Sequence, residues 1–210
     1  MSKTRPSSIS SNQKRKEEVK ELKVILLGEP GVGKTNIISR YLSNSFNERS
    51  NPTLGSTFGE KNISKDGITY SLKVWDTTGQ EKYNSITKLF VKGAHIVVLV
   101  YSIDNLESFQ KLNFWHNYIK EELQENKYIL ALVGNKRDLY ENEVVSEEDG
   151  KKLAEKKRAI FGLVSAKIDK PLIDKFFDYL LDEYISRFGS NFLEMTVSLD
   201  NNESKSKKCC

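Results

Sequence analysis

The chain has 210 residues, of which 30% are charged and 38% are hydrophobic, and its net charge at pH 7 is +4. These values predict one soluble globular domain with tails, and the small, scattered positive charge argues against nucleic acid as a partner. The polar N-terminus lacks the apolar core of a signal peptide, and the longest apolar run, residues 95–101, is too short to span a bilayer. We therefore expect the chain in the cytosol.

Residues 21–187 alternate between strand-like and helix-like segments. A Ser- and Lys-rich extension, residues 1–20, precedes them, and a polar tail, residues 188–210, follows. The composition of both ends predicts disorder in the extension and flexibility in the tail. Apolar runs that are typical of strands buried on both faces occur at 22–27, 95–101 and 128–134, and a further strand is expected at 159–164.

Two further strands, residues 57–64 and 68–75, are separated by the hairpin signal Asp66-Gly67, which predicts an antiparallel pair at one sheet edge. The alternation predicts a doubly wound α/β fold. We expect a six-stranded, mostly parallel sheet with one antiparallel edge strand, helices on both faces, and ligands at the carboxyl ends of the strands. Four helices are expected. The first begins near Gly33, and the second runs from Phe109 to Leu123 with Phe114, Trp115 and Tyr118 in the core. The third begins at a capping box at Ser146, and the fourth runs from Leu172 to Ile185.

Residues 28–35 match the phosphate-loop pattern G-x-x-x-x-G-K-[ST], between the first strand and the first helix. Glycines in such a loop let backbone N–H groups turn toward phosphate oxygens, and the helix start adds a positive end. We expect Lys34 to reach the β- and γ-phosphates and the Thr35 hydroxyl to ligate Mg²⁺. The context makes this a P-loop NTPase fold rather than a plain glycine-rich turn.

Asp76 stands at the end of the third predicted strand and is followed by Thr77, Thr78, Gly79 and Gln80. A carboxylate at this point is suited to hold Mg²⁺ through water. The Gly79 N–H can approach a γ-phosphate, and Gln80 can orient a water for in-line attack. A plain strand-end turn is the alternative, and the upstream phosphate loop argues against it.

Asn135, Lys136 and Asp138 follow the fifth strand, and Ser165-Ala166-Lys167 follow the sixth. Asp138 can accept two hydrogen bonds from the guanine edge, a pair of donors that adenine does not offer, so the motif predicts guanine selectivity. Lys136 can lie along the base, Asn135 can tie this loop to the phosphate loop, and 165–167 can complete the pocket with backbone N–H groups.

In this order and spacing, the four motifs resemble those of small GTPases of the Ras superfamily, over about residues 20–187. The segments 53–58, 73–76, 83–87 and 99–104 are similar to the Rab branch. The resemblance implies that Thr53 ligates Mg²⁺ and senses the γ-phosphate, and that Phe46 packs against the guanine ring. It also implies a hydrophobic effector patch of Phe58, Trp75 and Phe90, where the family usually has tyrosine at the third position.

These expectations define the candidate site. Hydrolysis is assigned to Gln80, Lys34 and Thr53, and Mg²⁺ to Thr35, Thr53 and, through water, Asp76. The residues expected to bind GTP or GDP are Gly28, Gly31, Val32, Gly33, Lys34, Thr35, Asn36, Phe46, Thr53, Gly79, Asn135, Lys136, Asp138, Ser165, Ala166 and Lys167.

The only cysteines, Cys209 and Cys210, are the last two residues, so no disulfide framework is expected. A Cys-Cys end resembles that of doubly geranylgeranylated Rabs, and two lipids beside basic residues satisfy the two signals of stable anchoring. Two unmodified thiols are the alternative. The resemblance further implies a monomeric core, cycling between the cytosol and the cytoplasmic face of an intracellular membrane. Its implied partners are effectors, an activating protein, an exchange factor and a prenyl-binding dissociation inhibitor.

The leading hypothesis is therefore a membrane-anchored guanine-nucleotide switch that hydrolyses GTP slowly and regulates vesicle traffic. Pro30, which offers no N–H, and Thr78 motivate an alternative, a GTP-binding scaffold with little or no hydrolysis. A P-loop kinase for a small metabolite is a third hypothesis, against which residues 135–138 argue.

Overall fold

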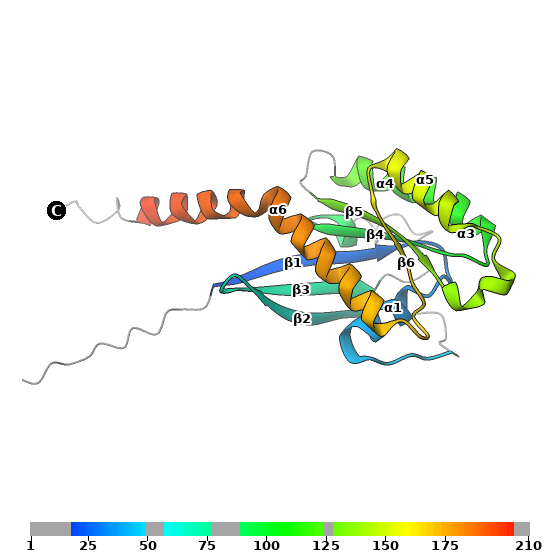
Figure 1. Cartoon of the computed structure of the whole chain (residues 1–210). Helices are drawn as coiled ribbons and strands as arrows, with labels where there is room; N and C mark the ends of the chain where they lie inside the picture. The colour runs from blue at the N-terminus through cyan, green and yellow to red at the C-terminus, as the bar shows by residue number, and fades with distance from the viewer. Residues whose placement is uncertain (1–17, 49–56, 77–88, 124–127, 204–210) are drawn as a thin grey trace, which may run out of the picture.

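The computed structural model describes residues 18–48, 57–76, 89–123 and 128–203, and from residue 190 it describes the backbone alone. One six-stranded sheet with the strand order β2-β3-β1-β4-β5-β6 forms the centre of the molecule (Figure 1). Its strands are β1 (Val19–Leu27), β2 (Thr57–Lys65), β3 (Ile68–Asp76), β4 (Ile96–Ser102), β5 (Ile129–Asn135) and β6 (Ile160–Leu163).

All neighbouring strands are parallel except β2 and β3, which form the antiparallel edge pair. Lys65 pairs with Ile68, so the hairpin loop has two residues, Asp66 and Gly67, with φ values of 52° and 77°. Positive φ at both central residues is typical of a type I′ turn, whose twist matches that of the two strands it joins. The predicted α/β fold, with its mostly parallel sheet and antiparallel edge, is confirmed.

Helices cover both faces of the sheet, and each face has its own core (Figure 1). Leu22, Val24 and Leu26 of β1 point to the face packed by α1 (Lys34–Ser43) and α6 (Lys170–Glu203). Ile25 and Leu27 point to the opposite face. There they share a core with α4 (Leu112–Leu123) and α5 (Glu147–Lys157), and α3 (Leu106–Gln110) precedes α4 in the chain. Successive side chains of β1 thus contribute to the cores on opposite faces of the sheet, as expected for a buried parallel sheet.

The structure corrects several element boundaries. Strand β1 begins at Val19, inside the extension predicted to be disordered, because Val19 and Lys20 pair with β3. The helix expected from Phe109 to Leu123 is divided into α3 and α4 at Lys111. A 3₁₀ helix, η1 (Arg137–Asn142), was not predicted. Helix α6 continues to Glu203, past the boundary predicted at residue 187, and extends beyond the sheet in Figure 1.

Two predictions about side chains have opposite outcomes. The Ser146 hydroxyl accepts a hydrogen bond from the Asp149 N–H, so Ser146 caps α5 as predicted. Phe114 was expected in the core but is 53% exposed, whereas its neighbour Trp115 is buried. Only one side of α4 packs against the sheet, and Phe114 lies on the other.

Within the described part of the chain, no helix combines the length and apolar character that crossing a membrane requires.

Candidate functional site

The loop between β1 and α1 curls tightly because its three glycines, Gly28, Gly31 and Gly33, all have positive φ. Gly33 has a φ of 94°, and a Cβ there would lie 2.3 Å from the Asn135 amide nitrogen. A Cβ on Gly28 would lie 2.1 Å from the Val100 carbonyl oxygen. Both positions therefore require glycine, as the phosphate-loop interpretation expects.

Lys34 begins α1 and turns its side chain back into this loop. Its ammonium group is buried and donates hydrogen bonds to the carbonyl oxygens of Gly28, at 2.5 Å, and Glu29, at 3.2 Å. A cation held inside a loop of turned glycines, at a helix N-terminus, is suited to meet an anion. Val32 is buried below the loop, whereas Pro30 and Gly31 are exposed at its rim.

Asp76 ends β3 beside the start of α1. It is 2% exposed, and neither of its carboxylate oxygens accepts a well-formed hydrogen bond from the residues described. Burial raises the pKa of Asp76, while the Thr35 hydroxyl and the Lys34 charge act in the opposite direction. A buried carboxylate with spare acceptors next to a hydroxyl is a donor set that suits Mg²⁺, so Asp76 and Thr35 fit the predicted ion.

Asn135 joins three of the predicted motifs. Its Nδ2 donates to the carbonyl oxygen of Val32 at 2.8 Å, and its Oδ1 accepts from the Ala166 N–H at 3.1 Å. Asn135 is buried, so these bonds lie away from solvent. The predicted tie between the phosphate loop and the base-binding loops is therefore present in the structure.

Asp138 and Ser165 meet although they come from different loops. The Ser165 hydroxyl donates to Asp138 Oδ1 at 2.5 Å and accepts from the Lys167 N–H at 3.1 Å. This bond occupies one carboxylate oxygen and orients the carboxylate. Lys136 stands next to them in a left-handed conformation, with its ammonium 3.8 Å from Asp104 Oδ1.

Two further candidate residues of the nucleotide site lie in the first turn of α1, Asn36, and just after that helix, Phe46. Phe46 is half-buried against the core that α1 and α6 share. Asn36 forms a pair of hydrogen bonds with the backbone of Asn47, at 3.0 and 3.1 Å. Thr53, Gly79 and Gln80, together with Cys209 and Cys210, lie outside the described residues, so their assigned roles stay predictions.

The three residues of the predicted effector patch come together on one surface. The ring of Trp75 lies 5.2 Å from that of Phe58 and 5.7 Å from that of Phe90. Phe58 is 57% exposed, and Lys23 places its ammonium 5.4 Å from the Trp75 ring centre. Exposed aromatic groups of this kind are suited to protein contacts.

No role was predicted for Arg40, Arg137 or Asp169, which the structure places around the loops predicted to bind the base. Arg137 pairs with Asp169, and Asp169 also accepts from the Ser165 N–H at 2.8 Å. Asp169 directly precedes α6, where aspartate is a helix-start signal. The sequence therefore contained a signal for Asp169, but it contained no signal for the long-range contacts of the two arginines.

Comparisons with known proteins agree with this geometry. A model of the Ras family matches residues 23–203. Ras-related protein RabC of Dictyostelium discoideum is 35% identical over 191 residues, which cover 90% of this chain and 96% of the relative. Ras-related protein Rab-17 of Homo sapiens is 33% identical over 192 residues, 90% of each chain. Ras-related protein Rab-11B of Dictyostelium discoideum is 39% identical over 181 residues, 86% of this chain and 80% of the relative.

Proposed function

This chain belongs to the Ras family, as a small GTPase of the Rab type, and from that premise we propose that it is a membrane-anchored switch in vesicle traffic. GTP and GDP would occupy the site formed by the phosphate loop and the two base-binding loops. Mg²⁺, when bound, would supply positive charge at the phosphates. Thr35 and, through water, Asp76 would hold it, together with Thr53.

The observation that carries this proposal is the pair of hydrogen bonds made by Asn135. They fix the phosphate loop, through Val32, relative to the base loop, through Ala166. One nucleotide can then be held at both ends, with Lys34 at the phosphates and Asp138 at the base. A site whose two ends are held together by such bonds spends less binding energy on ordering.

For hydrolysis, Lys34 and the N–H groups of the loop would stabilise charge on the γ-phosphate while Gln80 positions the attacking water. The sequence offers no arginine that is an obvious partner for the γ-phosphate. We therefore expect slow intrinsic turnover and an activating protein that supplies the missing group. The loops around 46–60 and 77–92 would respond to the γ-phosphate through Thr53 and Gly79.

Nucleotide selectivity tests the base site. Purified protein should bind GDP and GTP and should bind ADP and ATP far more weakly. Inosine diphosphate lacks the 2-amino group that Asp138 would accept, and a site that hydrogen-bonds a donor rejects the analogue without it. We expect its affinity to be about 10-fold or more below that of GDP. Equal affinity for ADP and GDP would reject the assignment of Asp138.

Membrane attachment is the second part of the proposal. Cys209 and Cys210 would carry the lipids, and Lys205, Lys207 and Lys208 would add about 1 kcal/mol each at an anionic leaflet. A tagged chain with its C-terminus free should be membrane-bound, and the Cys209→Ser/Cys210→Ser variant should be cytosolic. Identical distributions, or unmodified thiols in mass spectra of the native protein, would contradict attachment.

A scaffold that binds GTP and hardly hydrolyses it is the second candidate. Pro30 favours it, because this exposed residue at the rim of the phosphate loop offers no N–H to a phosphate. The Gln80→Leu variant separates the two functions. If the chain is a timed switch, this variant has a larger GTP-bound fraction than the parent protein. An unchanged fraction would favour the scaffold.

A further inference from the structure

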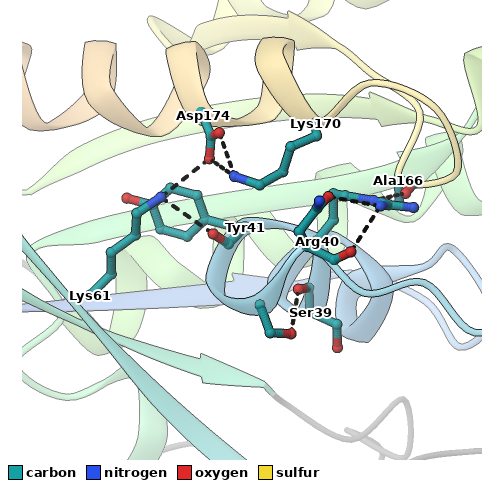
Figure 2. A network of polar contacts seen from close by, with 9 residues as sticks. Ser39, Arg40, Tyr41, Lys61, Ala166, Lys170 and Asp174 are labelled. Carbon is teal, nitrogen blue, oxygen red and sulfur yellow. Dashed lines mark hydrogen bonds and ion pairs between the residues drawn. The ribbon is translucent and has the colours of Figure 1, made fainter.

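Arg40 lies on α1 and reaches across to the loop that follows β6. Its Nε donates to the carbonyl oxygen of Ala166 at 2.8 Å, and its Nη2 donates to that of Lys167 at 2.9 Å. Figure 2 shows the side chain directed from the helix to Ala166. The same segment, residues 165–167, was predicted to complete the guanine pocket with backbone N–H groups. In the structure these N–H groups donate within the protein, to Asp169, Asn135 and the Ser165 hydroxyl. Arg40 binds the carbonyl groups of the segment and so fixes its position.

The third guanidinium nitrogen faces the end of α1. Nη1 donates to both the carbonyl oxygen and the side-chain oxygen of Asn44, at 3.1 and 2.9 Å. Two residues further on, the ring centre of Phe46 lies 5.9 Å from the guanidinium carbon, at the outer limit of a cation–π contact. One side chain therefore touches the base loop and the segment that bears Phe46.

Two more contacts tie the segment around Phe46 to the same neighbours. Asn36 of α1 pairs with the backbone of Asn47. Lys167 of the base loop pairs with Glu48 at 2.9 Å, on the exposed surface. Surface ion pairs of this kind contribute little to stability. Arg40 connects the same two parts of the proposed base site, and its bond to Ala166 is partly buried.

We propose that Arg40 is a positioning residue for guanine-nucleotide binding. By fixing the carbonyl groups of Ala166 and Lys167 relative to Phe46, it holds the edge-binding loop and the ring-stacking residue at one spacing, and thereby slows nucleotide release. A fork of several N–H donors is needed, because a lysine ammonium does not match two carbonyl groups and Asn44 at once. The inference rests on the proposed function, since it concerns the same base site.

Lys61 provides a matched control in the same network (Figure 2). It reaches α1 from β2 and donates to the carbonyl oxygen of Tyr41 at 3.3 Å and to Asp174 Oδ1 at 3.2 Å. Asp174 is also bonded to Lys170. Like Arg40, Lys61 joins α1 to another part of the molecule, but neither of these contacts involves the base loop or the residues around Phe46.

The experiment measures release of a fluorescent GDP analogue into excess GDP for the full chain, with Mg²⁺ and with the ion chelated. Thermal unfolding is measured on the same samples. Arg40→Ala should release the nucleotide about 10- to 50-fold faster than the parent protein. The ratio should persist after chelation because Arg40 acts on the base end of the nucleotide. The release rate of Arg40→Lys should lie between those of the parent protein and Arg40→Ala. Lys61→Met should lower the unfolding temperature, but its release rate should stay within about twofold of the parent rate.

Three results would overturn the inference. Release from Arg40→Ala at the parent rate would leave the residue with a structural role alone. An equal acceleration in Lys61→Met would show a general loosening of α1 instead of a base-site effect. An acceleration that disappears on chelation would place the effect at the metal end. If Arg40→Ala does not fold, Arg40→Lys and Arg40→Gln decide by the same criteria. A parent protein that binds no guanine nucleotide would reject the proposed function itself, and the inference with it.

Discussion

The guanidinium group of Arg137 forms two parallel hydrogen bonds with the carboxylate of Asp169, at 2.5 and 2.9 Å. Arg137 begins η1, which follows β5, and Asp169 lies in the loop after β6, so the pair joins the two segments predicted to bind the base. Asp169 is buried and Arg137 is partly exposed. The hydrogen bonds to Asp169 raise the pKa of Arg137 further above its already high value.

Removing either partner should destabilise the fold, with the larger effect at Asp169. Arg137→Ala leaves the buried carboxylate with the Ser165 N–H, whereas Asp169→Ala also leaves that N–H without its acceptor. We expect losses of about 1–2 kcal/mol for Arg137→Ala and about 2–4 kcal/mol for Asp169→Ala, after allowing for solvent at the arginine. Denaturant unfolding of both single variants and the double variant measures the coupling. A coupling near zero would contradict the pairing.

Asn135→Ala should weaken both stability and nucleotide binding. The variant leaves the Val32 carbonyl and the Ala166 N–H buried without the partner they have now. Each unsatisfied group costs about 1–3 kcal/mol, so GDP affinity should fall by about 100-fold or more. Calorimetric titration with GDP measures the change, and Lys152→Ala on the exposed face of α5 serves as the control. A variant that retains the parent affinity would show that the two loops do not need this connection.

The sequence predicted those features that depend on residues close together in the chain. The phosphate loop, the Asp66-Gly67 hairpin and the Ser146 cap are local patterns, and the structure contains each of them. The meeting of Asp138 and Ser165 followed from sheet topology, because both stand after neighbouring parallel strands.

Contacts made by long side chains between distant segments could not be predicted. Arg40 is separated from Ala166 by 126 positions, and its rotamer depends on where α1 packs. The exposure of Phe114 has a similar origin, since α4 has aromatic residues on more than one side and only tertiary packing selects the buried one. The break between α3 and α4 lies at Lys111, which has an ordinary helical conformation and gives no sequence signal.

Tyr41→Phe should be at least as stable as the parent protein. The Tyr41 ring is buried and stacks on Phe177 with 4.1 Å between centroids, but its hydroxyl is buried with no hydrogen-bond partner among the described residues. Removing an unsatisfied hydroxyl removes a desolvation cost of about 1–3 kcal/mol. Tyr41→Ala should instead cost about 3–5 kcal/mol because the cavity remains. Thermal unfolding of both variants tests this, and a Tyr41→Phe variant less stable than the parent by more than 1 kcal/mol, about one lost hydrogen bond, would indicate a partner for the hydroxyl.

His95 should make the stability of the fold depend on pH. The backbone N–H of Lys23 donates to His95 Nδ1 at 2.9 Å, which requires that nitrogen to be unprotonated. Burial lowers the pKa of His95, and the nearby Lys23 charge lowers it further. Among the described residues, Tyr184 also lies against the ring, and burial raises its pKa to about 12, so it stays neutral in the relevant range.

Because its folded-state pKa is depressed, His95 binds fewer protons in the folded chain than in the unfolded chain. The stability linked to it is complete above the unfolded pKa of about 6.5 and is lost as pH falls below that value, by at most about 1.4 kcal/mol per pH unit. His95→Asn keeps an acceptor for the Lys23 N–H and removes the titration, so its stability should vary less between pH 5 and 7. The pKa of His116 is also lowered, but that residue contributes equally to both proteins, and the difference between them isolates His95. Unfolding with excess GDP across this range measures that difference, and a difference that does not grow with pH would mean that His95 is not held in its neutral form.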